Sequence, residues 1–419
     1  MRGRARAALG STLPDLARGR LLLMVALLAA ATYANALGNG WALDDEFIVA
    51  GSPGVTEARW GDAIGGAYWT GLDAPPALWR PATLVVLTAE WRMFGDRPGA
   101  FHAVSLALHA GVSVLVTLLL AALLPGTAAA AGGALFAVHP VHVEAVANVV
   151  GQSELLAAAG YLGACLLYLW RRGAEPVGRA LATGGVALLY ALALGAKESA
   201  VTLPGALVFL ELLVPSRSAP ARAPRERLVR EAPLALLLAA VLAAYLVVRV
   251  WVLGAVAGEL IAPELEGLGG AARVATALSL WPTYLRLLIA PLALSADYGA
   301  GVLFATRALP SSVVIGGLVL AGLVAVLARS RRATPWAALA AGWLVLTMLP
   351  VSQLLLPTGT LLAERTLYLP SVAAARSRGS LVPTPRVCAR PGEWAPPWSR
   401  PSSSVASSAI RPGWTATPS

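Results

Sequence analysis

The sequence predicts an all-α, polytopic membrane protein, and three observations support this fold class. Of the 419 residues, 57% are hydrophobic and only 13% are charged, and the mean hydropathy is +0.69. A soluble domain carries about 25% charged residues, so a soluble fold is excluded. Apolar runs long enough to cross a bilayer recur along the chain, and most arginines gather in the short segments between them.

Nine apolar runs are predicted to be transmembrane helices. They cover 21–37, 101–124, 127–139, 154–170, 179–196, 199–214, 233–253, 311–328 and 334–350. The first run follows an arginine-rich segment and lacks a small-x-small cleavage site, so we expect an uncleaved anchor. A tenth span begins at 367–375 and breaks off where Ser, Pro, Arg and Trp become dominant. The chain thus divides into a cytoplasmic segment (1–20), a membrane domain (21–375) and a tail (376–419) that is either disordered or the product of a frameshift.

The arginine-rich loops predict the topology. The net charge of +10 comes from arginine, and Lys197 is the single lysine. With a cytoplasmic N-terminus, the clusters at 171–179, 217–230 and 329–332 all fall inside, as the positive-inside rule requires. Because these arginines set topology, we expect no nucleic-acid partner. The two cysteines, one in an apolar run and one in the tail, indicate neither a disulfide framework nor a metal site.

Two further segments, 81–94 and 274–291, are apolar but interrupted by charged residues or proline. We expect them to form amphipathic helices at the membrane surface. A span at 274–291 would also move the cluster at 329–332 to the outside. Two outer loops, 38–100 and 254–310, are therefore predicted to hold most of the mass outside the membrane.

An acidic pair, Asp44 and Asp45, comes just after the first span and emerges on the outer side by this topology. Carboxylates at a membrane surface can act as a general base toward a hydroxyl, or meet a lipid-linked substrate directly or with a metal. Solvated loop residues after a helix end are the alternative.

All four histidines lie between 102 and 142. His102 shares one face of the second span with Ser105 and His109. Ionisable groups within a membrane tend to line a cavity or face a partner helix, so this face is either part of a site or a hydrogen-bonded contact between helices.

The turn after the third span carries His139 and His142, followed by Glu144. The His-x-x-His spacing permits a metal, but on a helix Glu144 would point away from His142. Contact with a substrate phosphate or sugar, metal binding and a structural cap all remain open.

Cations and carboxylates occur together at three further positions on the outer side: Arg80, the pair Lys197 and Glu198, and the pair Glu364 and Arg365. Arginine suits bidentate phosphate recognition, and a lysine at membrane depth needs a partner. Plain ion pairs are the alternative for each. The topology brings seven residues from distant parts of the chain to one membrane face: Asp44, Asp45, Arg80, His139, His142, Lys197 and Arg365.

These motifs resemble a known family, the transmembrane O-mannosyltransferases that carry TPR repeats. The resemblance rests on residues 39–45, 79–81, 101–109, 136–146, 196–199, 284–298 and 363–370. The His-Pro-Val-His block and the Glu-Arg-x-Leu-Tyr-Leu-Pro block are its most specific parts. The chain departs from the family at Ser105, where we expect Asn, and at Gln152, where we expect Arg, and no TPR repeat follows the membrane domain.

The resemblance implies a GT-C fold of about nine to ten transmembrane helices and a polyprenyl-phosphate-linked mannose donor. It also implies transfer to Ser or Thr hydroxyls of an exported protein. On this interpretation Asp44 or Asp45 is the base. Arg80, Lys197 and Arg365 hold the phosphate with Glu198, Glu364 and Glu144 beside them, and His102, His139 and His142 line the site.

The expected partners are membrane lipid, the lipid-linked donor and the protein acceptor. No resident cofactor is expected, and a divalent metal stays open. We expect an integral membrane protein of the bacterial inner membrane with its site facing the periplasm. A transporter or flippase of a lipid-linked saccharide and an inactive truncated scaffold are the rival interpretations.

Overall fold

The computed structural model describes residues 15–69, 78–214, 223–256, 261–299, 310–355 and 358–379. Within these ranges the secondary structure is helical throughout and no strand occurs, as the sequence predicts. The last helix, α16 (Ser371–Gly379), includes the first four residues of the predicted tail, and the rest of the tail lies outside the described residues.

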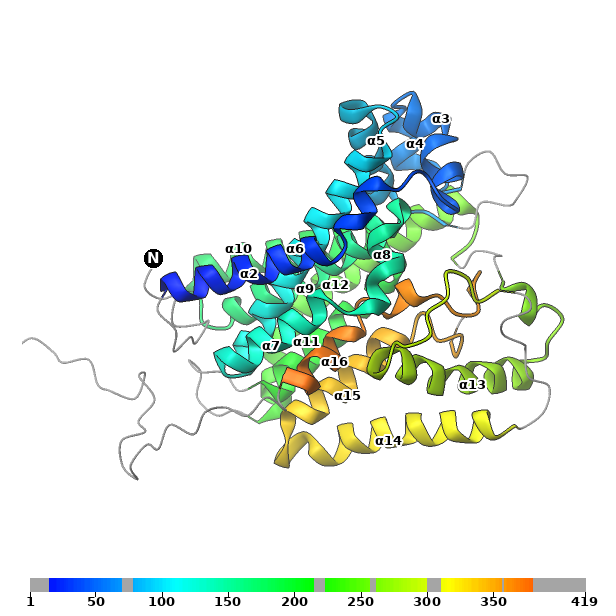
Figure 1. The fold of residues 1–419 in the computed structure, drawn as a ribbon. Coiled ribbons are helices and arrows are strands. Elements are labelled where there is room, and N and C mark those ends of the chain that lie inside the picture. Colours follow the sequence, from blue (N-terminus) through cyan, green and yellow to red (C-terminus); the bar gives the residue numbers. More distant parts are fainter. Residues whose placement is uncertain are drawn as a thin grey trace, which may run out of the picture. The chain divides into compact units, whose positions relative to one another are not determined.

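Short helices of the first predicted outer loop form a small lobe with its own apolar core. It contains η2 (Glu46–Ala50), α3 (Pro53–Thr56), α4 (Trp60–Gly65) and α5 (Pro81–Phe94). Figure 1 shows α3, α4 and α5 together, and Ile48, Val55 and Leu87 are among the buried residues they share. The predicted helix at 81–94 is confirmed at both ends. Pro81 suits the first helical position, and Gly95, at φ 63°, ends the helix.

The main bundle contains longer helices. They are α2 (Asp15–Thr32), α6 (Pro98–Leu123), α7 (Gly126–Ala137), α9 (Gln152–Arg171), α10 (Pro176–Ala196), α11 (Leu203–Leu213), α12 (Pro224–Leu253), α13 (Gly270–Ile289), α14 (Ser311–Ala333) and α15 (Pro335–Met348). Between them lie η1 (Ala34–Gly38), η3 (Pro140–His142), α8 (Val143–Ala147), η4 (Val149–Gly151), η5 (Glu198–Thr202), η6 (Pro263–Leu265) and η7 (Glu364–Leu367).

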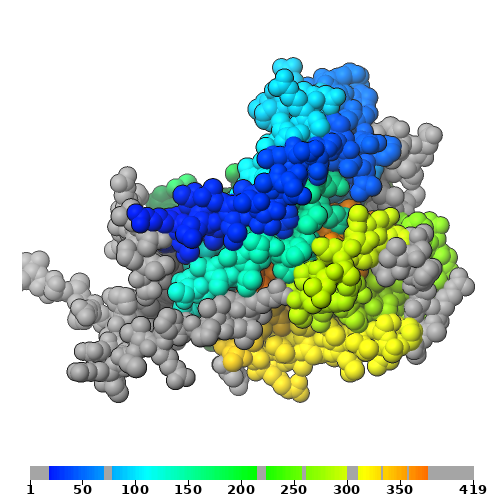
Figure 2. Space-filling model, viewed as in Figure 1, coloured from blue at the N-terminus to red at the C-terminus, as the bar shows by residue number. Residues whose placement is uncertain are grey.

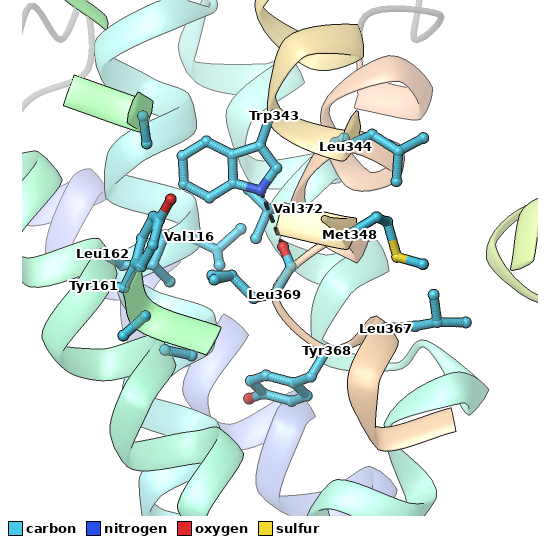
Figure 3. Packing of buried hydrophobic residues seen from close by; sticks show 14 of the residues in the cluster. Val116, Tyr161, Leu162, Trp343, Leu344, Met348, Leu367, Tyr368, Leu369 and Val372 are labelled. Atoms are coloured by element: carbon cyan, nitrogen blue, oxygen red, sulfur yellow. Dashed lines mark hydrogen bonds between the residues drawn. The ribbon is translucent and has the colours of Figure 1, made fainter. Parts of the chain in front are cut away.

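One contiguous apolar core joins most of these helices. Within this core, the indole of Trp343 in α15 donates a 3.0 Å hydrogen bond to the carbonyl of Leu369, just before α16 (Figure 3). The same indole packs edge-on against the ring of Tyr161 in α9, 5.4 Å away. The segment that the sequence assigns to the start of a tenth span is therefore packed inside the bundle.

Five helices in the described part of the chain are long and apolar enough to cross a membrane. They are Pro98–Leu123, Val149–Arg171, Pro176–Ala196, Pro224–Leu253 and Ser311–Arg331. A sixth arises if α7 and the helix at Pro140–Ala147, which are bent by 49°, count as one span. Several apolar helices support an integral membrane protein, whereas the predicted nine to ten spans are not confirmed.

The predicted spans that fall short are helical but brief. α15 has 14 residues and α11 has 11. At 1.5 Å per residue they reach about 21 and about 17 Å, less than the roughly 30 Å of a hydrocarbon core. α2 has 18 residues, but its first turns contain Asp15, Arg18 and Arg20. Apolar composition thus predicted these helices without predicting their lengths.

The helix predicted at 274–291 is present as α13. Figures 1 and 2 show α13 (yellow-green) lying lengthwise against α14 (yellow), one of the candidate spans. Gly316 permits this close approach, because a Cβ there would overlap the carbonyl of Leu278. The side of the membrane on which 254–310 lies stays a prediction.

Candidate functional site

The acidic pair after the first predicted span is split into a buried and an accessible member. Asp45 is fully buried, and its carboxylate accepts hydrogen bonds from the backbone N–H groups of Val149 (3.2 Å) and Val150 (2.8 Å). Burial raises the pKa of Asp45 to about 6 in spite of these bonds. Asp44 is half-buried, and its side chain forms no hydrogen bond or ion pair within the described ranges. Asp45 therefore anchors the segment, and Asp44 is the member of the pair without a partner within the described ranges.

The backbone just before this pair adopts an uncommon conformation. Leu43 has φ 53°, in the left-handed region, and its side chain is 60% exposed. This conformation costs about 1–2 kcal/mol for a residue other than glycine. The Asp45 N–H, 3.1 Å from the carbonyl of Ala42, closes the turn. Anchoring Asp45 thus holds Asp44 in a strained segment, as is common at functional sites.

Arg80 precedes α5 and reaches across to η5. Its guanidinium donates through Nε and Nη2 to the two carboxylate oxygens of Glu198, both at 3.0 Å. The same group lies 4.9 Å above the ring of Tyr68, a cation–π contact. Burial alone would raise the pKa of Glu198, but Arg80 outweighs it and lowers the value to about 2. Glu198 is therefore ionised and orients Arg80.

Lys197, at the end of α10, is buried and paired with Glu154 at the start of α9. Its pKa is lowered, first by burial and further by Arg80 and Arg365, while Glu154 raises it. Two more cations thus lie close enough to Lys197 to act on its charge. The convergence of all seven predicted residues on one membrane face stays a prediction.

Arg365 is held by Glu144 of α8, which accepts from the Arg365 backbone N–H at 2.8 Å and also pairs with its guanidinium. The neighbouring Glu364 accepts from the Ser295 backbone N–H (2.8 Å) and the Tyr298 hydroxyl (2.6 Å). Burial raises the pKa of Glu364. Glu144 therefore positions an arginine, and Glu364 ties η7 to the segment after α13.

Each of the four histidines contacts the protein through at least one ring nitrogen, whereas Nδ1 of His102 and Nδ1 of His142 are buried without a hydrogen-bond partner within the described residues. Nε2 of His139 lies 3.1 Å from the Leu288 carbonyl, and Nε2 of His142 lies 2.8 Å from Oγ of Ser371. His109 bonds to the Tyr368 hydroxyl at 2.7 Å and the Ala137 carbonyl at 3.1 Å. His102 is fully buried, with Nε2 3.4 Å from the Gly40 carbonyl. A role for them in substrate contact stays a prediction.

The described ranges contain no cluster of three His, Cys, Asp or Glu side chains that could hold a metal. The residues present therefore do not fit a metal site assembled from this part of the chain alone. Both carboxylate oxygens of Asp45 accept hydrogen bonds from backbone N–H groups, and Glu144 pairs with Arg365 rather than with His142.

Three further residues of this region, Tyr68, Glu154 and Glu90, contact the predicted site residues or lie next to them, and no motif in the sequence predicts this. Glu90 is buried and accepts a 3.1 Å hydrogen bond from Nε2 of Gln152, and burial raises its pKa to about 7. Gln152 lies just past the turn that anchors Asp45. Its departure from the family pattern was the one feature of the sequence that pointed to this contact with Glu90.

Comparisons with known proteins agree with the motifs. The chain is 35% identical over 185 residues to protein O-mannosyl-transferase Tmtc2 of Drosophila melanogaster, which covers 42% of this chain and 20% of that protein. With Tmtc3 of the same fly it shares 27% identity over 363 residues, 70% of this chain and 38% of the relative. With human TMTC4 it shares 29% over 218 residues, 46% of this chain and 29% of the relative.

No family model matches the chain, and no solved structure does. The matches span about a fifth to two fifths of the length of these three relatives. Together with the ordered motifs, they show that the chain is similar in sequence to the TMTC-type protein O-mannosyl-transferases.

Proposed function

We propose that this chain is an integral-membrane glycosyltransferase. In the proposed reaction a sugar, mannose, passes from a polyprenyl-phosphate donor to Ser or Thr hydroxyls of a protein on the outer membrane face. The observation that carries the proposal is that Arg80 and Arg365 lie close enough to Lys197 to lower its pKa, and that Lys197 is held by Glu154, one turn beyond the backbone groups that anchor Asp45. The names of the relatives support the reaction class, and the donor and the membrane face rest on this cluster and on the arginine-rich loops.

In the proposed reaction Asp44 is the general base. As the acceptor oxygen attacks C1 of the sugar, its proton passes to the Asp44 carboxylate. The bond between C1 and the phosphate oxygen breaks at the same time, and the lipid phosphate leaves with the electron pair. A half-buried carboxylate without a partner suits this role, whereas Asp45 is committed to backbone N–H groups.

The three cations would stabilise the leaving phosphate. Arg80 uses Nε and Nη2 on Glu198, which leaves the N–H groups of Nη1 for a ligand. Because guanidinium has five N–H donors in a fixed plane, it can be oriented by one anion while it binds another. Lys197 and Arg365 each have a single carboxylate partner and would add charge on the same side.

The test compares two aspartate variants of the full chain in proteoliposomes with polyprenyl-phosphate mannose and a Ser/Thr-containing acceptor. Asp44→Asn should lower turnover by about 10²-fold or more, because it removes the basic oxygen. Asp62→Asn, a control on exposed α4, should transfer at the parental rate. Equal rates for the parent and the Asp44→Asn variant would sink the general-base role.

A parent chain that binds the donor but transfers nothing would support the scaffold interpretation instead. Net movement of the lipid-linked sugar between leaflets without transfer would support the flippase. Both outcomes would overturn the proposed reaction.

A further inference from the structure

An apolar groove runs along the outer surface of α6. It encloses about 700 Å³, and its walls include Phe94 at the end of α5 and Ala159 of α9. Its floor is a stripe of small residues, Ala103, Ala107 and Gly111, all exposed and four residues apart. From Ala100 to Leu115 the groove spans about 22 Å at 1.5 Å per residue. That length and its apolar lining match a hydrocarbon chain of one bilayer leaflet.

Aromatic residues mark the level of one end of this groove. Trp41 stacks on Trp91 with ring centroids 6.0 Å apart, and its indole donates a 2.8 Å hydrogen bond to Asp96. Tryptophan side chains collect at the headgroup level of membranes. The end of the groove at Phe94 and Ala100 therefore lies where lipid headgroups begin.

Two exposed arginines lie at this same end. Arg92 comes two residues before Phe94, and Arg97 comes three residues before Ala100. In the described structure neither side chain has an ion-pair partner, unlike Arg59, which is paired with Glu57. With Asp96 engaged by the indole, the three charges sum to +1, which matches the single negative charge of a phosphate diester. Basic residues beside a helix groove are typical of bound anionic lipid.

A stripe of small residues can be covered by another transmembrane helix or by a lipid chain, and the two arginines favour the lipid. Small residues four apart can receive another transmembrane helix, as in dimers of spans. A symmetric pair of α6 helices packed along this stripe would bring Arg97 of both copies together, and like charges repel. An anionic lipid meets the same charges with attraction.

We propose that this groove binds an anionic membrane phospholipid, with one acyl chain along Ala103, Ala107 and Gly111 and its phosphate at Arg92 and Arg97. This site is separate from the proposed donor site, since the groove side of α6 faces away from the buried face that carries His102 and His109. Close van der Waals contact with the small residues holds the chain, and the arginines select the headgroup.

The experiment uses the purified full chain in phosphatidylcholine vesicles that contain a trace of phosphatidylglycerol with a photoreactive acyl chain. Irradiation and peptide mapping should place the label on residues 100–115 of α6. Unlabelled phosphatidylglycerol should compete, and added phosphatidylcholine should not. Ala107→Phe fills the groove and should abolish this label, whereas Ala239→Phe, at an exposed alanine of α12, should leave it unchanged.

The charge variants test headgroup selection separately. Arg92→Ala and Arg97→Ala should each lower the preference for phosphatidylglycerol by about fivefold, as expected for one arginine near a lipid surface. Arg59→Ala should not change it.

Three results would overturn the proposal: labelling that does not depend on the headgroup, labelling that survives Ala107→Phe, or displacement by polyprenyl phosphate alone, which would assign the groove to the donor. Efficient disulfide cross-linking of two Ala107→Cys chains would overturn it too, in favour of a second copy. The lipid readout does not depend on sugar transfer, so it can fail or succeed independently of the proposed function.

Discussion

The two ends of α9 carry ion pairs of the same chemistry in different arrangements. At the end near Asp45, called here the site end, Arg80, Lys197 and Arg365 each pair with a carboxylate of their own. At the other end, called here the clamp end, one carboxylate, that of Glu211 in α11, accepts from Tyr168 (2.6 Å), Arg172 (3.2 Å) and Arg227 (3.0 Å). A separate pair there joins Arg171 to Glu231 of α12. The clamp end thus ties α9, α11 and α12 to one buried carboxylate.

The two arrangements of ion pairs suit different roles. A carboxylate shared by three donors is saturated and holds helices together, so its loss is a loss of stability. Cations with one partner each retain unused N–H groups and can accept a second anion. The site end also contains carboxyls with raised pKa values, Asp45 and Glu90, that no cation pairs with in the described structure.

The largest expected effect breaks the clamp end. Glu211→Ala leaves Arg172 and Arg227 without their buried partner, so we expect the free energy of unfolding to fall by about 3 kcal/mol. Denaturant unfolding of the purified chain in detergent measures this. Glu226→Ala, at an exposed glutamate of α12, is the control and should stay within about 0.5 kcal/mol of the parent. A loss confined to sugar transfer would mean that the two ends do not differ as described.

The site end should show the opposite pattern. Arg365→Ala removes a charge-assisted contact, so donor affinity should fall about tenfold while acceptor affinity is retained. Binding of fluorescent polyprenyl-phosphate mannose, and of the acceptor separately, gives both values. Lys197→Ala should act in the same direction, and Arg59→Ala should have no effect. Unchanged donor affinity in both site variants would remove them from the phosphate site.

A pH titration sharpens the comparison further. The pKa of Glu90, about 7 in the folded chain, lies above its usual value of about 4.5, so folding favours the protonated acid. That contribution is complete below about pH 4.5 and is lost as the pH rises through 7. It amounts to roughly 3 kcal/mol. Glu90→Gln should flatten this dependence of unfolding free energy on pH, and Glu57→Gln should not. A parent chain equally stable at pH 5 and pH 7.5 would contradict it.

The smallest expected effect concerns the side of the membrane on which each end of α13 lies, and only a labelling experiment detects it. The arginine-rich loops predict that both ends of α13 are outside, whereas its packing along α14 resembles that of a span. In a background without cysteines, Glu266→Cys and Asp297→Cys should both react with an impermeant thiol reagent on intact cells. Reaction of Glu266→Cys alone would show that α13 crosses the membrane.

The sequence predicted those helix ends that local residues determine, and it missed those that depend on packing. α5 was predicted to the residue because Pro81 and Gly95 delimit an apolar run. α11 and α15 were predicted as spans because hydropathy records how apolar a segment is. It does not record that Leu203 ends a 3₁₀ turn or that the chain bends after Met348. Such ends depend on packing against neighbours.

The predicted site residues stay predictions, whereas the ion pairs among them are seen only in the structure. The arginine-rich loops predict one membrane face for Arg80, Lys197 and Arg365, and in the structure Arg80 and Arg365 lie close enough to Lys197 to lower its pKa. Their partners could not be read from the sequence, because Glu144 lies 221 residues from Arg365 and Glu198 pairs with Arg80 rather than with adjacent Lys197. The roles of these residues in transfer stay predictions.

The anchoring of Asp45 on Val149 and Val150 has a consequence for how the region can vary. The turn that fixes Asp45, and with it Asp44, runs directly into the first turn of α9, where Glu154 holds Lys197. The proposed base, Asp44, and one proposed phosphate-binding cation, Lys197, are therefore both positioned by the start of α9, and their alignment does not depend on the loops that lead to them. A residue inserted between Val150 and Glu154 would rotate one against the other by about 100° of helix. Lengthening the connection before Arg80 would leave the alignment unchanged.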